Sequence, residues 1–289
     1  MTHVISSLAE ISADYDVVFC DLWGCLHNGV AAYPAAVAAL QGFRAKGGKV
    51  VLLTNAPRPW PWVQRQLDRM GVPHDAWDAI VSSGDAAQDA MFAGAVGRKV
   101  WAIMMPKDEG FFTDIPAGRE HEPPIQRVPL EQAQGIVCTG MFDDTTEIPE
   151  DYRGRLELAR DRGLPLLCAN PDVIVDLGDK RIYCAGALAE FYEGLGGRSL
   201  YFGKPHKPIY DLARRRLGLG PDARILGIGD GIATDIPGAR GDGIDALFVS
   251  GGLAFDQFGP DVDRPEQAKL DEWLSMRGEN PRYSIGRLR

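Results

Sequence analysis

Short runs of consecutive apolar residues alternate with amphipathic segments along most of this chain. The runs are shorter than ordinary helices and rich in β-branched residues, which is typical of buried strands. They predict strands at residues 16–20, 49–53, 100–103, 136–138, 165–168, 200–202, 224–228 and 246–249. The segments between them predict helices at residues 34–46, 60–70, 151–162, 186–195 and 208–217.

Apolar strands that alternate with helices are typical of a parallel sheet whose two faces are both covered by helices. The pattern therefore predicts an α/β protein. One stretch, residues 106–126, breaks the alternation, because it is charged, contains several prolines and has no clear period. We expect it to be either a long surface excursion or the entry into a second domain.

Length and composition narrow the class of protein. A chain of 289 residues is long enough for one large domain or two ordinary ones. Its hydrophobic fraction of 45% excludes a disordered chain, and five cysteines are too few for a disulfide scaffold of this length. The formal net charge of -9, with no basic stripe, argues against a nucleic-acid partner.

The sequence also indicates where the protein works. No apolar run approaches the roughly 18 residues that a membrane span needs. The first residues lack the basic region and apolar core of a signal peptide, and the cysteines form no C-x-x-C pair. We therefore expect a cytoplasmic protein with reduced cysteines and no membrane partner.

Polar groups follow several of the predicted strands. In open parallel sheets, ligands bind at the carboxyl ends of the strands. The residues found there are Asp21, Thr54, Asn55, Lys204, Asp230 and Asp235. Carboxylates serve as nucleophiles toward phosphorus or as ligands of Mg²⁺, while a hydroxyl, amides and a lysine stabilise a transferring phosphoryl group. The set favours phosphoryl transfer.

Each of these residues has an ordinary explanation when taken alone. An Asp at a strand end commonly caps a turn, and the pair Thr54-Asn55 would cap the next one. Lys204, in a Gly-Lys-Pro loop, would be a solvated lysine. The order of the whole set along the chain is therefore what carries the functional inference.

That order resembles the haloacid dehalogenase (HAD) superfamily of hydrolases. The motifs are Asp21-x-x-Gly24, Thr54-Asn55, Gly203-Lys204-Pro205 and Gly229-Asp230-x4-Asp235. Further details are similar to class IIA, the NagD-like and 4-nitrophenylphosphatase-like proteins. These are Asn170-Pro171-Asp172 before Gly186-Ala187-Leu188, and Ser250-Gly251-Gly252 after the last strand. The resemblance covers residues 16–252.

The resemblance implies a Rossmann-like core with a doubly wound parallel sheet and an inserted α/β cap domain of the C2 type. Residues 1–84 and 200–289 would form the discontinuous core, and residues 85–199 the cap. Closure of the cap would expel water from the reaction site. Relatives often dimerise through the cap, so a homodimer of this kind is the assembly that the resemblance implies.

The resemblance also implies residue roles. Asp21 would be the nucleophile, and Mg²⁺ would be bound by Asp21, by the backbone carbonyl of Trp23 and by Asp230, with Asp235 acting through water. Phosphate oxygens would be held by Thr54, by the amide of Asn55 and by Lys204. Asn170 and Asp172 would face the substrate, a small phosphorylated metabolite.

The first motif departs from the family pattern, Asp-x-Asp-Gly, because Trp23 occupies the second Asp position. In the family that Asp protonates the leaving group and then activates water. Tryptophan transfers no proton, while general acid–base catalysis contributes about 10²–10⁴-fold. The backbone contact to the metal would survive the replacement.

Three explanations of Trp23 remain open. Another residue supplies the proton, with His27 in the right segment, and Asp85, Asp172 or a cap residue as alternatives. The protein is a genuine but weak phosphatase. Or the site binds a phosphorylated ligand without turnover, as a regulatory protein would.

Overall fold

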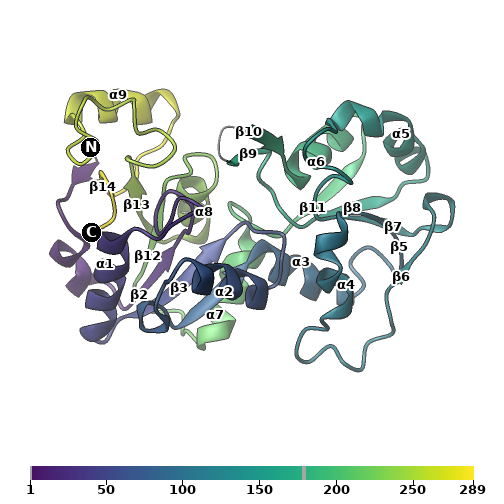
Figure 1. The fold of residues 1–289 in the computed structure, drawn as a ribbon, viewed down its shortest axis with the longest axis horizontal. Helices are drawn as coiled ribbons and strands as arrows, with labels where there is room; N and C mark the ends of the chain where they lie inside the picture. The colour runs from purple at the N-terminus through teal and green to yellow at the C-terminus, as the bar shows by residue number, and fades with distance from the viewer. Residues whose placement is uncertain (1, 178–179) are drawn as a thin grey trace. The chain divides into compact units, whose positions relative to one another are not determined.

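The computed structural model describes residues 2–177 and 180–289. The chain forms two compact units. The core unit comprises residues 1–54, 64–81 and 205–289, and the cap unit comprises residues 55–63 and 82–204. Both chain ends belong to the core unit, where β1 and β14 pair side by side (Figure 1).

A seven-stranded sheet forms the centre of the core unit, in the order β1-β14-β13-β12-β2-β3-β4. All the pairings from β1 to β3 are parallel. The strands are β1 (His3–Val4), β2 (Val17–Cys20), β3 (Lys49–Thr54), β4 (Ala79–Ser82), β12 (Ile225–Gly229), β13 (Asp245–Val249) and β14 (Tyr283–Ile285). From β2 the chain adds β3 and β4 on one side of the sheet and later adds β12, β13 and β14 on the other side. The switch point of the topology therefore lies beside β2, and ligands bind at such points in open parallel sheets.

Helices cover both faces of this sheet. On one face, Ile209 and Ala213 of α7 (Lys207–Leu217) pack against Val17 and Phe19 of β2. Side chains alternate along a strand, so Val18 points to the opposite face, and it too is fully buried. The remaining helices of the core region are α1 (Pro34–Ala45), α2 (Trp60–Arg69), α8 (Asp235–Asp242) and α9 (Gln267–Met276).

The helix ends agree with their sequences. Pro34 opens α1, where its fixed φ suits the first helical position. Gly47, with φ +93°, follows the end of that helix and turns the chain toward β3. Gly218, with φ +61°, ends α7 in the same way.

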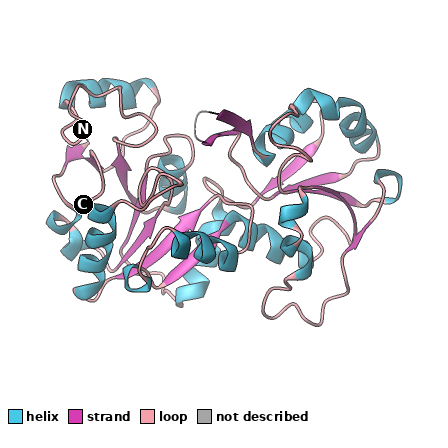
Figure 2. Ribbon diagram, viewed as in Figure 1, coloured by secondary structure: helices cyan, strands magenta, loops and turns pink. Residues whose placement is uncertain are grey.

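The cap unit is built on a five-stranded parallel sheet in the order β11-β8-β7-β5-β6. Its strands are β5 (Lys99–Ile103), β6 (Gln126–Arg127), β7 (Gly135–Cys138), β8 (Pro165–Cys168) and β11 (Arg198–Tyr201). An antiparallel hairpin, β9 (Ile174–Leu177) with β10 (Lys180–Tyr183), follows β8. The helices are α3 (Ser83–Phe92), α4 (Gly110–Thr113), α5 (Arg153–Asp161) and α6 (Ala185–Gly194), as Figure 2 shows by colour.

Short 3₁₀ helices complete both units. They are η1 (Leu8–Glu10), η2 (Ser12–Asp14), η3 (His74–Ala76), η4 (Pro106–Asp108), η5 (Leu130–Gln132) and η6 (Pro149–Tyr152). No helix within the described part of the chain is long and apolar enough to cross a membrane.

The predicted fold class is confirmed: a doubly wound parallel sheet is accompanied by a second α/β unit. The exact domain bounds, 1–84 with 200–289 and 85–199, stay a prediction. One strand crosses the predicted bound at residue 200. Residues 198–201 form β11, which pairs with β8 in the cap unit, although the sequence predicted that the core resumes at residue 200. An apolar run identifies a strand but not the sheet that it joins.

Candidate active site

Three predicted site residues lie at one edge of the core sheet. Asp21 follows β2, Asp230 follows β12 and Thr54 ends β3, and β2 lies between the other two strands. The parallel pairing places their carboxyl ends at the same edge. The backbone N–H of Asp21 donates to the carbonyl of Ile228 at 2.8 Å, which extends the pairing of β2 with β12 to the site residue itself.

A compact cluster of ligand atoms forms at this edge. A carboxylate oxygen of Asp21, the Sγ of Cys25 and a carboxylate oxygen of Asp230 all lie within 4.8 Å of one another. These residues are buried, with exposed fractions of 8%, 1% and 5%. Burial and the charges of Asp230 and Asp21 raise the pKa of the Cys25 thiol well above its ordinary value. With no cation bound, Cys25 is therefore neutral.

A tight turn brings Cys25 into the cluster. The N–H of Leu26 and that of His27 both donate to the carbonyl of Leu22. Gly24 lies in this turn with φ +71°, and a Cβ built on it would come 1.9 Å from Asp230 Oδ2. Only glycine fits this position, both for its backbone conformation and for its approach to Asp230.

Backbone groups orient the Asp230 carboxylate. The N–H of Leu253 donates to Asp230 Oδ2 at 2.9 Å. A Cβ on Gly252 would come 2.1 Å from the same oxygen, so the chain after β13 approaches the carboxylate as closely as the Gly24 turn does. Asp230 is thus fixed between two glycine-containing segments.

Asp235 is held separately, at the start of α8. Its Oδ2 accepts a hydrogen bond from the N–H of Gly231 at 3.0 Å, and its own N–H donates to the Gly231 carbonyl at 2.8 Å. Asp235 is 8% exposed and is not a member of the close ligand cluster. Its predicted action through water, rather than by direct ligation, stays a prediction.

The donor atoms at this edge fit a divalent cation. Two buried carboxylates provide the hard oxygen ligands that Mg²⁺ prefers, and the glycines next to Asp230 place no side chain against its carboxylate. The Cys25 thiol is the exception, because sulfur is a poor ligand for Mg²⁺.

Trp23 lies at the surface of the same turn. Its side chain is 41% exposed and stands edge-on to the His27 ring, with the ring centroids 5.4 Å apart. A Cβ on Gly29 would come 2.2 Å from Trp23 Cη2, so a glycine makes room for the indole.

His27 has the wrong environment for a proton donor. It is 1% exposed, and burial lowers its pKa to about 4, so the ring is neutral near neutral pH. Its Nδ1 accepts a hydrogen bond from the N–H of Gly29 at 3.0 Å. We infer that His27 stabilises this turn, and this argues against the proton-donor role suggested by its sequence position.

In the cap unit, the side-chain amide of Asn55 joins two other predicted site residues, Lys204 and Asp172. Asn55 Oδ1 accepts from the N–H of Lys204 at 2.7 Å, and Asn55 Nδ2 donates to the Lys204 carbonyl at 3.0 Å. Nδ2 also donates to Asp172 Oδ1 at 2.8 Å. Asn55 and Lys204 are 5% and 3% exposed. The side chain therefore ties together segments that follow β3, β8 and β11.

Asn170 supports this group. Its Oδ1 accepts from the N–H of Asp172 at 3.0 Å, closing a turn after β8. A Cβ on Gly186 would come 2.2 Å from the Pro171 carbonyl, so this turn packs directly on the start of α6. These contacts give Asn170 and Asp172 a positioning role; the substrate contact that the resemblance implies stays a prediction.

Asp85 is used in capping α3. Its Oδ2 accepts from the N–H of Ser82, while its Oδ1 accepts from the N–H of Trp60 at 3.1 Å. Its own N–H donates to the Ser82 hydroxyl. The reciprocal capping box with Ser82 uses Oδ2, and the Trp60 N–H uses Oδ1.

Sequence reasoning missed Cys25 as a member of the site. The available signal was its spacing, four residues after Asp21 in the same turn. Spacing alone does not say that the turn folds back, because that depends on the positive φ of Gly24.

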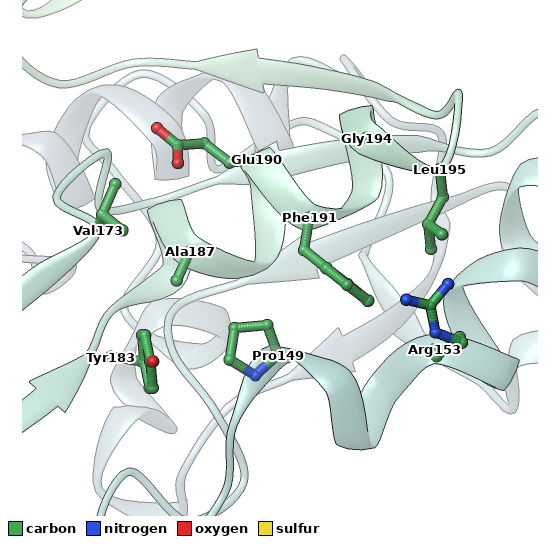
Figure 3. A pocket seen from close by; sticks show the side chains of 9 residues that line it. All are labelled: Pro149, Arg153, Val173, Tyr183, Ala187, Glu190, Phe191, Gly194 and Leu195. Carbon is green, nitrogen blue, oxygen red and sulfur yellow. The ribbon is translucent and has the colours of Figure 1, made fainter.

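A separate cavity of about 500 Å³ lies on the cap unit, and none of the predicted site residues is among those that line it (Figure 3). Phe191 and Ala187 of α6 line it, with Pro149 and Tyr183 across from them. Its lining is mainly apolar, and it contains no cluster of metal-ligating side chains.

Comparison with known proteins places the chain in a family. The family model for haloacid dehalogenase-like hydrolases matches residues 18–115, and a related HAD-hydrolase-like model matches residues 201–266. A crystal structure of a hydrolase of the haloacid dehalogenase-like family from Brucella suis is 40% identical, covers 99% of this chain and 100% of its own, and has a TM-score of 0.82. The chain is a member of the haloacid dehalogenase-like hydrolases.

More distant structures share the fold. A p-nitrophenyl phosphatase from Archaeoglobus fulgidus is 20% identical over 95% of this chain and 97% of its own, with a TM-score of 0.73. A glycerol phosphate phosphatase from Mycobacterium tuberculosis, solved with magnesium, is 22% identical over 87% of this chain and 73% of its own, with a TM-score of 0.65.

One curated relative is much longer. The Caenorhabditis elegans protein named "Putative NipSnap protein" is 24% identical over an alignment of 248 residues, which covers 78% of this chain and 46% of that protein. The chain therefore spans about half the length of the curated relative that it matches.

Proposed function

We propose that this chain is a Mg²⁺-dependent phosphatase that hydrolyses a small phosphorylated metabolite through a phospho-Asp21 intermediate. The observation that carries the proposal is the pair of buried carboxylates, Asp21 and Asp230, at the carboxyl edge of adjacent parallel strands. Family membership supports hydrolysis, and the phosphatase names of the distant structures with the same fold support phosphate esters as substrates.

The proposed nucleophile is Asp21. One carboxylate oxygen forms a bond to phosphorus while the bond from phosphorus to the ester oxygen breaks, and the leaving alcohol takes up a proton. Water then attacks the phosphorus of phospho-Asp21, which regenerates the carboxylate and releases phosphate. Asp21 is well suited to this because the end of β2 fixes its backbone.

The proposed metal ligands are Asp21, Asp230 and the backbone carbonyl of Trp23, with Asp235 acting through water. Bound Mg²⁺ would neutralise the charge of the carboxylates and of the phosphate. The magnesium in the glycerol phosphate phosphatase structure supports this choice of cation.

Phosphate binding is proposed for Thr54, for the backbone amide of Asn55 and for the ammonium group of Lys204. Positive charge and preorganised donors stabilise the transferring phosphoryl group. The Asn55 side chain holds the Lys204 backbone on both its N–H and its carbonyl, and this fixes where the lysine side chain begins.

Several finer features remain proposals. Substrate contact by Asn170 and Asp172, a homodimer through the cap and a cytoplasmic location all follow from the sequence and the family resemblance.

Trp23 favours a second candidate, a protein that binds a phosphorylated ligand without turnover. Its indole offers no proton, burial keeps His27 neutral, and the Asp85 carboxylate accepts two backbone hydrogen bonds. This candidate predicts metal-dependent ligand binding and no hydrolysis across a broad panel of phosphate esters.

The test is hydrolysis of p-nitrophenyl phosphate with and without Mg²⁺, by the wild type and by Asp21→Asn. We expect Mg²⁺-dependent release of nitrophenol, and its loss by at least about 10⁴-fold in the variant, as for other catalytic nucleophiles. Unchanged activity in Asp21→Asn would contradict the mechanism. Binding of phosphate esters without hydrolysis would favour the second candidate.

A further inference from the structure

The Cys25 thiol gives the carboxylate cluster a second kind of metal chemistry. Its Sγ lies within 4.8 Å of carboxylate oxygens of both Asp21 and Asp230. Across residues 2–177 and 180–289, this is the one group of three metal-ligating side chains that the structure brings so close together.

The thiol points into the cluster without another role. Cys25 is 1% exposed, and its Sγ makes no hydrogen bond to any other residue that the structure describes. By contrast, the Sγ of Cys20 donates to the Asp21 carbonyl, that of Cys138 to the Gly140 carbonyl and that of Cys168 to the Asn170 carbonyl. A buried, unpartnered thiol facing two carboxylates is an arrangement typical of a metal ligand.

We propose that Asp21, Cys25 and Asp230 form a three-ligand site for a thiophilic divalent cation of the Zn²⁺ and Cd²⁺ class. Zn²⁺ accepts carboxylate and thiolate ligands together in a tetrahedral arrangement, and three protein ligands leave one position for water. Mg²⁺ requires an octahedral oxygen shell and does not use the thiol. The two kinds of cation would therefore share Asp21 and Asp230 but differ at Cys25.

Binding has a simple proton balance. The thiol loses its proton to solvent as the sulfur–metal bond forms, so one thiol and one dication give a metal-bound thiolate and one released proton. Occupation of the site would engage the Asp21 carboxylate in a tightly held complex. Because Asp21 is the proposed nucleophile, this would inhibit hydrolysis, and that consequence rests on the proposed phosphatase function. The metal binding itself depends only on the three side chains of the cluster.

The experiment is a Cd²⁺ titration of the tag-free protein in thiol-free, oxygen-free buffer, followed by near-ultraviolet absorption. A thiolate–Cd²⁺ charge-transfer band should saturate at one ion per chain. Cys25→Ser, which keeps the size of the side chain and removes its soft donor, should lose the band and weaken Cd²⁺ binding by more than about tenfold, since even second-shell changes commonly cost 10- to 100-fold.

Cys138→Ser is the matched control, because Cys138 is equally buried but lies in the cap unit. It should keep both the band and the affinity. Absence of the band in the wild type, or an undiminished band in Cys25→Ser, would overturn the proposal.

X-ray absorption of the Zn²⁺-loaded wild type avoids any dependence on the folding of a variant. It should show one sulfur neighbour at about 2.3 Å beside oxygen neighbours. A shell of nitrogen and oxygen alone would overturn the proposal. Sulfur ligation in the Zn²⁺-loaded protein, together with no p-nitrophenyl phosphate hydrolysis by the Mg²⁺-loaded protein, would retain this metal site and refute the proposed phosphatase, so the two failures are distinguishable.

Discussion

The core and cap units both place polar residues just beyond the ends of parallel strands, but they hold them by different means. In the core unit, backbone turns position the carboxylates: Gly24 and Gly252 approach Asp230 so closely that no side chain would fit. In the cap unit, a side chain does this work, because the Asn55 amide binds the Lys204 backbone and the Asp172 carboxylate.

This difference separates two kinds of chemistry. The core unit collects negative groups whose mutual repulsion is relieved when a cation binds. The cap unit joins the Asn55 amide, the Asp172 carboxylate and the Lys204 backbone through hydrogen bonds that involve no cation. We therefore expect substitutions in the turn that carries Asp21 and near Asp230, here called the core group, to change mainly the rate of the reaction. Substitutions of Asn55, Asp172 and Lys204, here called the cap group, should change either the rate or the free energy of unfolding.

The largest effect should come from restoring a proton-transfer group in the core, with Trp23→Asp. If the missing acid limits the reaction, hydrolysis of alkyl phosphates should rise by about 10²–10⁴-fold, the usual contribution of general acid–base catalysis. Trp23→Asn is the matched control, since it loses the same indole but gains no acid. Equal rates for the two variants would mean that another residue already transfers the proton.

A charge change in the cap group should have the next largest effect. Lys204→Met removes a buried ammonium, and kcat/KM for a phosphate ester should fall by about 10²–10³-fold, as when a transition-state donor is lost. Lys207→Met is the control, because Lys207 lies nearby with a side chain 69% exposed. Similar losses in both variants would show a general charge effect rather than a site at Lys204.

The pH dependence of stability should identify His27 as a structural residue of the core turn. Burial lowers its folded-state pKa from 6.5 to about 4. Its stabilising contribution is thus complete above pH 6.5 and is lost as the pH falls toward 4, because the unfolded state takes up the proton first. At 1.36 kcal/mol per pKa unit, the loss is about 3 kcal/mol.

The variant His27→Asn keeps an acceptor for the Gly29 N–H but does not titrate in this range. Denaturant unfolding of both proteins between pH 4 and pH 7 should show the extra loss in the wild type alone. If the two curves run parallel, the pKa of His27 is the same in the folded and unfolded protein, and His27 is again a candidate for the proton donor.

The smallest effect concerns the cap hydrogen bonds. Asn55→Ala leaves the Lys204 N–H, the Lys204 carbonyl and an Asp172 oxygen without this partner, and it should lower the free energy of unfolding by about 1–3 kcal/mol. Asp172→Asn retains an oxygen that accepts from Asn55, and should change stability by less than about 0.5 kcal/mol. Thermal unfolding measures both. An Asn55→Ala protein as stable as the wild type would show that the amide does not tie these segments together.

Much of the fold was predictable because it follows from local patterns. Apolar runs between helices gave the parallel α/β class, and the rule that strands end at a common edge brought Asp21, Thr54 and Asp230 together. The sheet that β11 joins was not predictable, because the choice of partner strand depends on the whole chain rather than on residues 200–202.

The environment of the site residues was less predictable than their position. Nothing local to His27 indicates its burial, and the place of Cys25 beside two carboxylates depends on a glycine with positive φ. The hydrogen bonds of Asn55 join residues separated by 117 and 149 positions, a distance over which sequence spacing carries no information.

Trapping the phosphorylated nucleophile tests the central claim most directly. Because p-nitrophenol leaves without a proton donor while water must still be activated, phospho-Asp21 should accumulate when the wild type turns over p-nitrophenyl phosphate with Mg²⁺. After acid quench and borohydride reduction, peptide mass spectrometry should find homoserine in place of Asp at position 21. Turnover with an unmodified Asp21, or with the modification on another carboxylate, would contradict the account.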